Sequence, residues 1–302
     1  MHHSPADSVH AVLWMTGALL SFCLLAVGAR ELSGGISVMQ MLLFRSVIGV
    51  VIIGLVIVSG RRWALFASAR PRLHGFRHLF HFAAQYCWFV GLGVLPLAEV
   101  FALEFTVPLW TMLIAVLFLG EQVTRRKLLA IGLCLAGVVL IVRPGSGVMN
   151  MASAIVIVAA ILFAISHSAT KALSSSEHPL TILFYMCLVQ LPLGLVLSIH
   201  GWKQPESGHW LWIVVIGITA LTAHYCMTRA MHHAEITTVV TLDFFRLPLI
   251  ILVGVVFYHE SFDGWLLAGA ALMLFGNRIN LGGSNVVPVS PDPQHEPVEL
   301  RR

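Results

Sequence analysis

The chain has 302 residues, of which 58% are hydrophobic and 11% are charged, and its mean hydropathy is +0.88. Soluble domains carry roughly 25% charged residues, so this chain has too little polar surface to cover a water-soluble globule. The formal net charge is +4, but Lys and Arg lie mostly between apolar segments and form no basic helical face. Nucleic-acid binding needs such a face. We therefore predict an integral membrane protein that does not bind nucleic acid.

Ten apolar segments approach the length of about 20 residues that a bilayer core requires of a helix. They cover residues 11–29, 37–59, 76–95, 98–119, 128–143, 151–172, 180–199, 209–228, 236–257 and 265–281. The first segment has no Lys or Arg before it, so we interpret it as a retained helix rather than a signal peptide. The predicted fold class is an all-α integral membrane protein with ten transmembrane helices.

The two halves of the chain repeat one layout. Glu104-Phe105, Pro108 and Gly120-Glu121 in the first half correspond to Asp243-Phe244, Pro248 and His259-Glu260 in the second. Secondary transporters are commonly built from such duplicated blocks of spanning helices. We predict a first repeat at residues 1–146 and a second at residues 147–282. Residues 283–302 are rich in proline, and we expect a disordered cytoplasmic tail there.

The distribution of positive charge predicts the orientation. If both termini lie in the cytoplasm, the cytoplasmic segments hold Arg61, Arg62, Arg70, Arg72, Arg77, Arg125, Arg126, Lys127, Lys171, Arg229, Arg278, Arg301 and Arg302. The opposite side then holds Arg30, Arg143 and Lys203. Each half has five helices, an odd number, so the second repeat is inverted relative to the first. We expect a multi-pass protein of an inner or plasma membrane.

Several short motifs connect the chain to a known family. They are Phe44-Arg45-Ser46, Leu95-Pro96-Leu97-Ala98-Glu99, Leu119-Gly120-Glu121 and Ala136-Gly137-Val138-Val139-Leu140. With them, residues 10–282 resemble the paired EamA repeats of the drug/metabolite transporter superfamily. The second half departs from the pattern, with Phe184-Tyr185 where the first has Arg45. The resemblance implies a ten-helix carrier with a central cavity and without ATP hydrolysis.

The chain itself also argues against an ATP-driven pump, because it has no GxxxxGK[ST] motif. We expect no cofactor and a gradient as the energy source.

Four ionisable side chains lie well inside predicted spans: Arg45, Glu104, Asp243 and Arg246. An unpaired charge there costs several kcal/mol, so each should face a partner or a wet cavity. Depth along the helices, at about 1.5 Å per residue, predicts that Arg45 meets Glu104. Asp243 and Arg246 are three residues apart and share a helical face.

Two interpretations of these charges remain open. The pairs are either structural, or a zwitterionic substrate exchanges with them, its carboxylate on the arginines and its amine on the acids. A second functional form is proton coupling, in which Glu104 takes up and releases a coupling proton.

Further side chains are candidates for lining the same cavity. The predicted substrate-binding set adds Gln85, Trp88, His224 and Tyr185 to the four ionisable residues, and Trp14, Tyr86, His167, Gln190 and Asn277 are weaker candidates. The aromatic residues would otherwise form an interfacial belt, and the glutamines would hydrogen-bond neighbouring helices. His224 is either a partner of Asp243 or a proton relay.

His74, His78 and His81 share one helical face but lack an acidic or thiol ligand beside them. We therefore interpret them as interfacial, solvated histidines and predict no metal site. Gly132 with Ala136, and Gly269 with Gly276, are small residues that let helices approach closely, either between the repeats or in a homodimer.

These features favour a secondary transporter that exports a small zwitterionic metabolite by alternating access. The resemblance offers amino-acid-like solutes first and, as a further reading, opine-type metallophores. An uptake carrier for S-adenosylmethionine or a vitamin is the alternative. A membrane-embedded lipid-modifying enzyme or a scramblase is the alternative of another class, although the chain has no catalytic motif that we recognise. Its partners would be the metabolite, membrane lipids and coupling protons.

Overall fold

The computed structural model describes residues 5–118, 124–142, 150–174, 176–233, 239, 242–261 and 263–281. Its helices are α1 (Pro5–Leu32), α2 (Val38–Ser59), α3 (Pro71–Val94), α4 (Leu97–Glu104), α5 (Val107–Phe118), α6 (Arg125–Val142), α7 (Met151–Ser174), α8 (Pro179–Ser198), α9 (His209–His233), α11 (Arg246–Tyr258) and α12 (Gly264–Leu281). Within these residues, six helical segments are long and apolar enough to cross a membrane, and two more are shorter and apolar. The predicted all-α fold is confirmed. Glu121 and the predicted tail lie outside the described residues.

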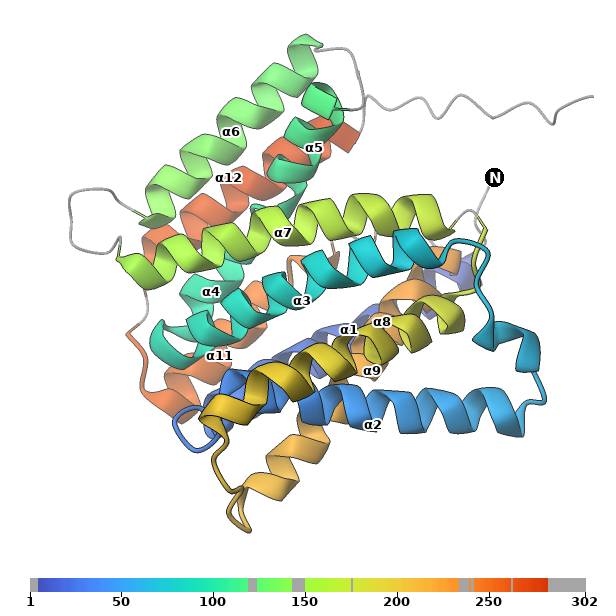
Figure 1. Ribbon diagram of the computed structural model, residues 1–302. Coiled ribbons are helices and arrows are strands. Elements are labelled where there is room, and N and C mark those ends of the chain that lie inside the picture. Colours follow the sequence, from blue (N-terminus) through green and yellow to red (C-terminus); the bar gives the residue numbers. More distant parts are fainter. Residues whose placement is uncertain are drawn as a thin grey trace, which may run out of the picture.

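Helices of the two halves pack in matched pairs (Figure 1). α1, the first helix of the first half, packs along α9, the third helix of the second half. In the same way α3, the third helix of the first half, packs along α7, the first helix of the second half. α2 packs on α8 and α6 on α12, and both contacts join equivalent helices, while α4, the first part of the fourth span, packs on α11, the second part of the ninth. This exchange is the arrangement that a twofold relation between inverted repeats produces.

Glycines allow α6 and α12 to approach closely. A Cβ on Gly137 would lie 2.6 Å from the carbonyl oxygen of Gly269, and a Cβ on Gly276 would lie 2.9 Å from that of Ala130. The predicted role of Gly269 and Gly276 between the repeats is therefore confirmed. Gly132 has open space around it and is not part of this contact. In the first half, Gly137 makes the close approach instead.

The fourth and ninth predicted spans are interrupted, which the sequence analysis did not predict. α4 ends at Glu104 and two residues separate it from α5, while a turn at residues 244–245 precedes α11. Pro108 and Pro248 explain both breaks, because a proline has no N–H to donate to the carbonyl four residues earlier. Those carbonyls belong to Glu104 and Phe244. Discontinuous helices of this kind form the midplane sites of many transporters.

Glu260 joins several helices at the end of the bundle that we predict to face outward. Its carboxylate accepts hydrogen bonds from the backbone N–H of Leu97 at 3.1 and 2.9 Å, at the start of α4. It also forms an ion pair of 3.3 Å with Arg30, which donates to the carbonyl of Leu95. The ends of α1, α3, α4 and α11 are thereby held together.

Candidate functional site

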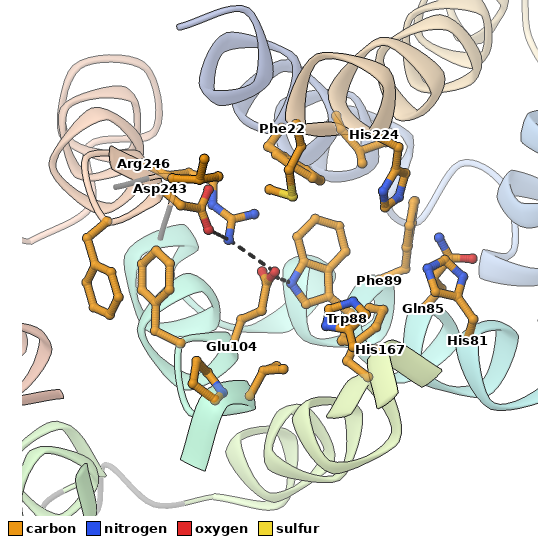
Figure 2. Close-up of a pocket in the computed structure, with 18 residues that line it drawn as sticks. Phe22, His81, Gln85, Trp88, Phe89, Glu104, His167, His224, Asp243 and Arg246 are labelled. Atoms are coloured by element: carbon orange, nitrogen blue, oxygen red, sulfur yellow. Dashed lines mark hydrogen bonds and ion pairs between the residues drawn. The ribbon is translucent and has the colours of Figure 1, made fainter. Parts of the chain in front are cut away.

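A cavity of about 240 Å³ lies between the two halves, around both helix breaks (Figure 2). Its aromatic walls include Phe22, Trp88, Phe89, Phe105, Phe163 and Phe244. Its polar lining consists of His81, Gln85, Glu104, His167, His224, Asp243 and Arg246. The volume is a little below the range of about 300–1,000 Å³ that is common for small-molecule sites.

Arg246 lies between the two carboxylates of the cavity. Its Nη2 is 3.3 Å from Oε1 of Glu104 and 3.1 Å from Oδ2 of Asp243. The second oxygen of Glu104 accepts a hydrogen bond of 2.9 Å from the indole N–H of Trp88, and Figure 2 shows Glu104 between these two partners. With both acids ionised, this cluster carries one net negative charge, so it favours a solute that has a cationic group.

Aromatic rings enclose the same arginine. The guanidinium carbon of Arg246 lies 4.6 Å from the ring centre of Phe22 and 5.2 Å from that of Phe105. Phe105 in turn stacks on Phe244, with ring centres 4.4 Å apart and ring planes at 12°. These two phenylalanines follow the two acids in the repeated layout, so the repeats meet ring to ring at the two helix breaks.

Most of the predicted site residues lie together. Those that line the cavity are Glu104, Asp243, Arg246, Gln85, Trp88 and His224, together with the weaker candidate His167. Tyr185 does not line it, because its ring stacks on His74 and its hydroxyl donates to the carbonyl of Phe66 at 3.3 Å. Trp14, Tyr86, Gln190 and Asn277 are also absent from the lining. A role of the lining residues in binding remains a prediction.

The predicted pair between Arg45 and Glu104 is wrong. Arg45 donates to the side-chain oxygen of Gln190 at 2.7 Å, whereas Glu104 pairs with Arg246. Depth along a helix does not determine which helices are neighbours: α2 packs on α8 and α9, and α4 packs on α11 and α7. The local pair of Asp243 with Arg246 is confirmed.

The interpretation of the α3 histidines as solvated is also wrong. His74 and His78 are 0% exposed and His81 is 1% exposed. His78 hydrogen-bonds to His74 at 3.2 Å and to the guanidinium of Arg77 at 2.7 Å. Among the described residues, no group of three or more His, Cys, Asp or Glu side chains could hold a metal ion.

His224 contacts rings rather than the acid suggested as its partner. Its ring centre lies 5.8 Å from that of Phe22 and 5.9 Å from that of His81. Sequence reasoning missed His81 and the phenylalanine walls. Among the phenylalanines, a usable signal was the repeated position of Phe105 and Phe244 directly after the two acids.

The model of the EamA-like transporter family matches residues 9–143 and again residues 150–281. The chain belongs to this family. Its two EamA repeats, predicted from the motifs, are thereby confirmed, and the chain is a secondary transporter rather than an enzyme.

Curated relatives differ in the solute that their names give. A riboflavin transporter of Rhizobium johnstonii is 31% identical over 189 residues, which is 62% of each chain. An S-adenosylmethionine uptake transporter of Rickettsia conorii is 23% identical and aligns with 68% of this chain and 70% of its own length. The pseudopaline exporter CntI of Pseudomonas aeruginosa is 26% identical, over 87% of this chain and 93% of its own.

A solved structure, described as the crystal structure of a protein, has the same fold, with a TM-score of 0.64 and 20% identity. It covers 89% of this chain and 96% of its own.

Proposed function

We propose that this EamA-family chain carries an amphoteric metabolite with a planar ring system across the inner or plasma membrane by alternating access. Both chain ends would lie in the cytoplasm, as the positive charges predict. The observation that carries the proposal is the cluster of Glu104, Arg246 and Asp243 inside an aromatic-walled cavity. Charged groups at a membrane midplane are costly, and transporters use them to bind solutes and coupling ions.

Three polar atoms of the cavity residues are buried without a hydrogen-bond partner in the described structure. They are Oδ1 of Asp243, Oε1 of Gln85 and Nε of Arg246. A buried polar atom without a partner costs about 1–3 kcal/mol, so a solute that satisfies these atoms gains binding energy. The surrounding rings favour a solute with an aromatic face, because stacked rings bind each other beyond their area of contact.

The name of one relative agrees with this class of solute, because S-adenosylmethionine combines a purine ring with an amino-acid group. Riboflavin, in the name of another, shares the flat fused ring system but has no cationic group. A proton on Glu104 or Asp243 would couple transport to the proton gradient by changing the charge of the cluster.

Export of a zwitterionic metabolite without a ring, including an opine-type metallophore, is the second candidate. The mixed acids and arginine of the cluster suit a solute with both amine and carboxylate groups. The pseudopaline exporter among the relatives supports this candidate, and it also supports outward transport.

Vesicles that contain the purified full-length chain test the proposal. Saturable counterflow of riboflavin or S-adenosylmethionine, lost in the Asp243→Asn variant, is the expected result. Exchange of amino acids alone would favour the second candidate, and transbilayer movement of fluorescent lipid without solute exchange would indicate a scramblase. For direction, a deletion strain that accumulates the solute inside the cell indicates export, and a strain that is depleted of it indicates uptake.

A further inference from the structure

Three buried side chains form a hydrogen-bonded chain behind the cavity wall. Arg45 of α2 donates to Oε1 of Gln190 in α8 at 2.7 Å, and the amide nitrogen of Gln190 lies 3.1 Å from Nδ1 of His81 in α3. Their exposed fractions are 2%, 0% and 1%. Within the part of the chain that the structure describes, no carboxylate pairs with Arg45, and its hydrogen-bond partner there is Gln190.

The direction of donation along this chain follows from chemistry. A guanidinium group has five N–H donors and no acceptor, so Gln190 must present its oxygen to Arg45. The amide nitrogen of Gln190 then faces His81 and donates to Nδ1. A ring nitrogen that accepts a hydrogen bond carries no proton, so the imidazole of His81 is neutral and its proton is on Nε2.

His81 lines the cavity, and no described residue hydrogen-bonds to its Nε2. This N–H donor is therefore left for a solute. Gln85 lies one helical turn further along α3, and its Oε1 is buried without a hydrogen-bond partner among the described residues. Figure 2 shows His81 and Gln85 on one side of the cavity and Asp243 with Arg246 on the other.

We propose that Arg45 and Gln190 are positioning residues that lock His81 as an Nε2–H donor, and that His81 thereby selects solutes with a hydrogen-bond acceptor at that point. The acceptor would be a carbonyl oxygen, a carboxylate oxygen or an unprotonated ring nitrogen. A solute with an N–H group there leaves two donors facing each other and binds about 10- to 100-fold more weakly. The selection rests on the proposed function, because it requires the solute to occupy this cavity.

The lock can be tested without any solute. Nitrogen-15 chemical shifts distinguish the two neutral forms of histidine, and the full-length chain in bilayer nanodiscs provides the sample, with His81→Gln used to assign the resonance. We expect the Nε2–H form in the wild type. Arg45→Lys is the matched control and should keep this form, because a lysine also only donates.

Gln190→Glu should reverse the tautomer, because a carboxylate accepts from both Arg45 and His81. His81 would then carry its proton on Nδ1 and present Nε2 as an acceptor. An Nδ1–H form in the wild type, or an unchanged or doubly protonated His81 in Gln190→Glu, would overturn the lock.

Oxidised and reduced riboflavin are the probes for selection, because reduction converts N5 of the ring system from an acceptor into an N–H donor. Under anaerobic conditions the wild type should bind the oxidised form about 10- to 100-fold more tightly, and Gln190→Glu should lose or reverse this preference. Equal binding of both forms by the wild type would overturn the selection. Binding of neither form would refute the proposed flavin-like solute and the selection with it, while the spectra would still decide the lock.

Discussion

Arg246 and Arg45 are both buried between the helices, yet their surroundings differ in kind. Arg246 is paired with two carboxylates and lies against phenylalanine rings, inside the cavity. Arg45 lies behind the cavity wall, and its hydrogen-bond partner is the neutral amide of Gln190. One buried arginine is therefore part of a cluster of ion pairs that a solute can reach, and the other is an orienting donor whose hydrogen-bond partner is uncharged.

This difference has an energetic consequence. A buried ion pair that loses one partner leaves an uncompensated charge, which is far more costly than a lost neutral hydrogen bond. A charged solute can also replace a carboxylate as the partner of Arg246. Arg45 instead donates to the side-chain oxygen of Gln190 and so fixes the orientation of its neighbours. We therefore assign binding to the Arg246 cluster and orientation to the Arg45 network, and four measurements test this assignment.

Replacing Arg246 with methionine should destabilise the protein by about 3–5 kcal/mol, because Glu104 and Asp243 would remain as two buried carboxylates without a cation. Thermal unfolding in nanodiscs measures this loss. Adding Glu104→Gln and Asp243→Asn to the same variant should restore much of the stability. A midpoint for Arg246→Met that equals the wild-type value would show that the cluster is not ionic.

Trp88→Phe keeps an aromatic ring in the cavity wall but removes the indole N–H that donates to Glu104. The loss of a hydrogen bond to a charged group predicts about 1.5–3 kcal/mol of lost stability. Combining Trp88→Phe with Glu104→Gln should cost less than the sum of the two changes, since both remove one interaction. Additive costs would contradict a shared hydrogen bond.

Arg45→Met should cost about 1–3 kcal/mol, because it leaves the side-chain oxygen of buried Gln190 without its donor. The expected loss is smaller than that for Arg246→Met, since no carboxylate remains behind. Thermal unfolding of the two variants side by side makes the comparison. An Arg45→Met variant that is the less stable of the two would contradict the distinction between an arginine paired with carboxylates and one bonded to an uncharged amide.

The pair of Arg30 and Glu260 provides a partly solvated reference for both buried sites, with side chains 21% and 12% exposed. Glu260→Gln keeps an oxygen for the N–H of Leu97 but loses the charge, so we expect a cost of about 0.2–1 kcal/mol. A double-mutant cycle with Arg30→Gln isolates the pair. A coupling free energy of several kcal/mol would show instead that this pair is as strongly coupled as the buried Arg246 cluster.

Composition, segment lengths and repeated motifs were sufficient to predict a membrane protein of two EamA repeats, because apolar length and local spacing are read along a single helix. The pair of Asp243 with Arg246 was predictable for the same reason, since residues three apart share a helical face. The helix breaks had a sequence signal in Pro108 and Pro248, which remove a donor in both repeats.

The partner of Glu104, the burial of His81 and the position of Arg45 behind the cavity wall depended on which helices are neighbours. Depth along each helix left that undetermined, because two side chains at the same depth can lie on opposite sides of a bundle. The packing of α2 on α8 and of α4 on α11 decided it. Small residues such as Gly137 let two helices approach closely, but the sequence alone does not say which helix faces them.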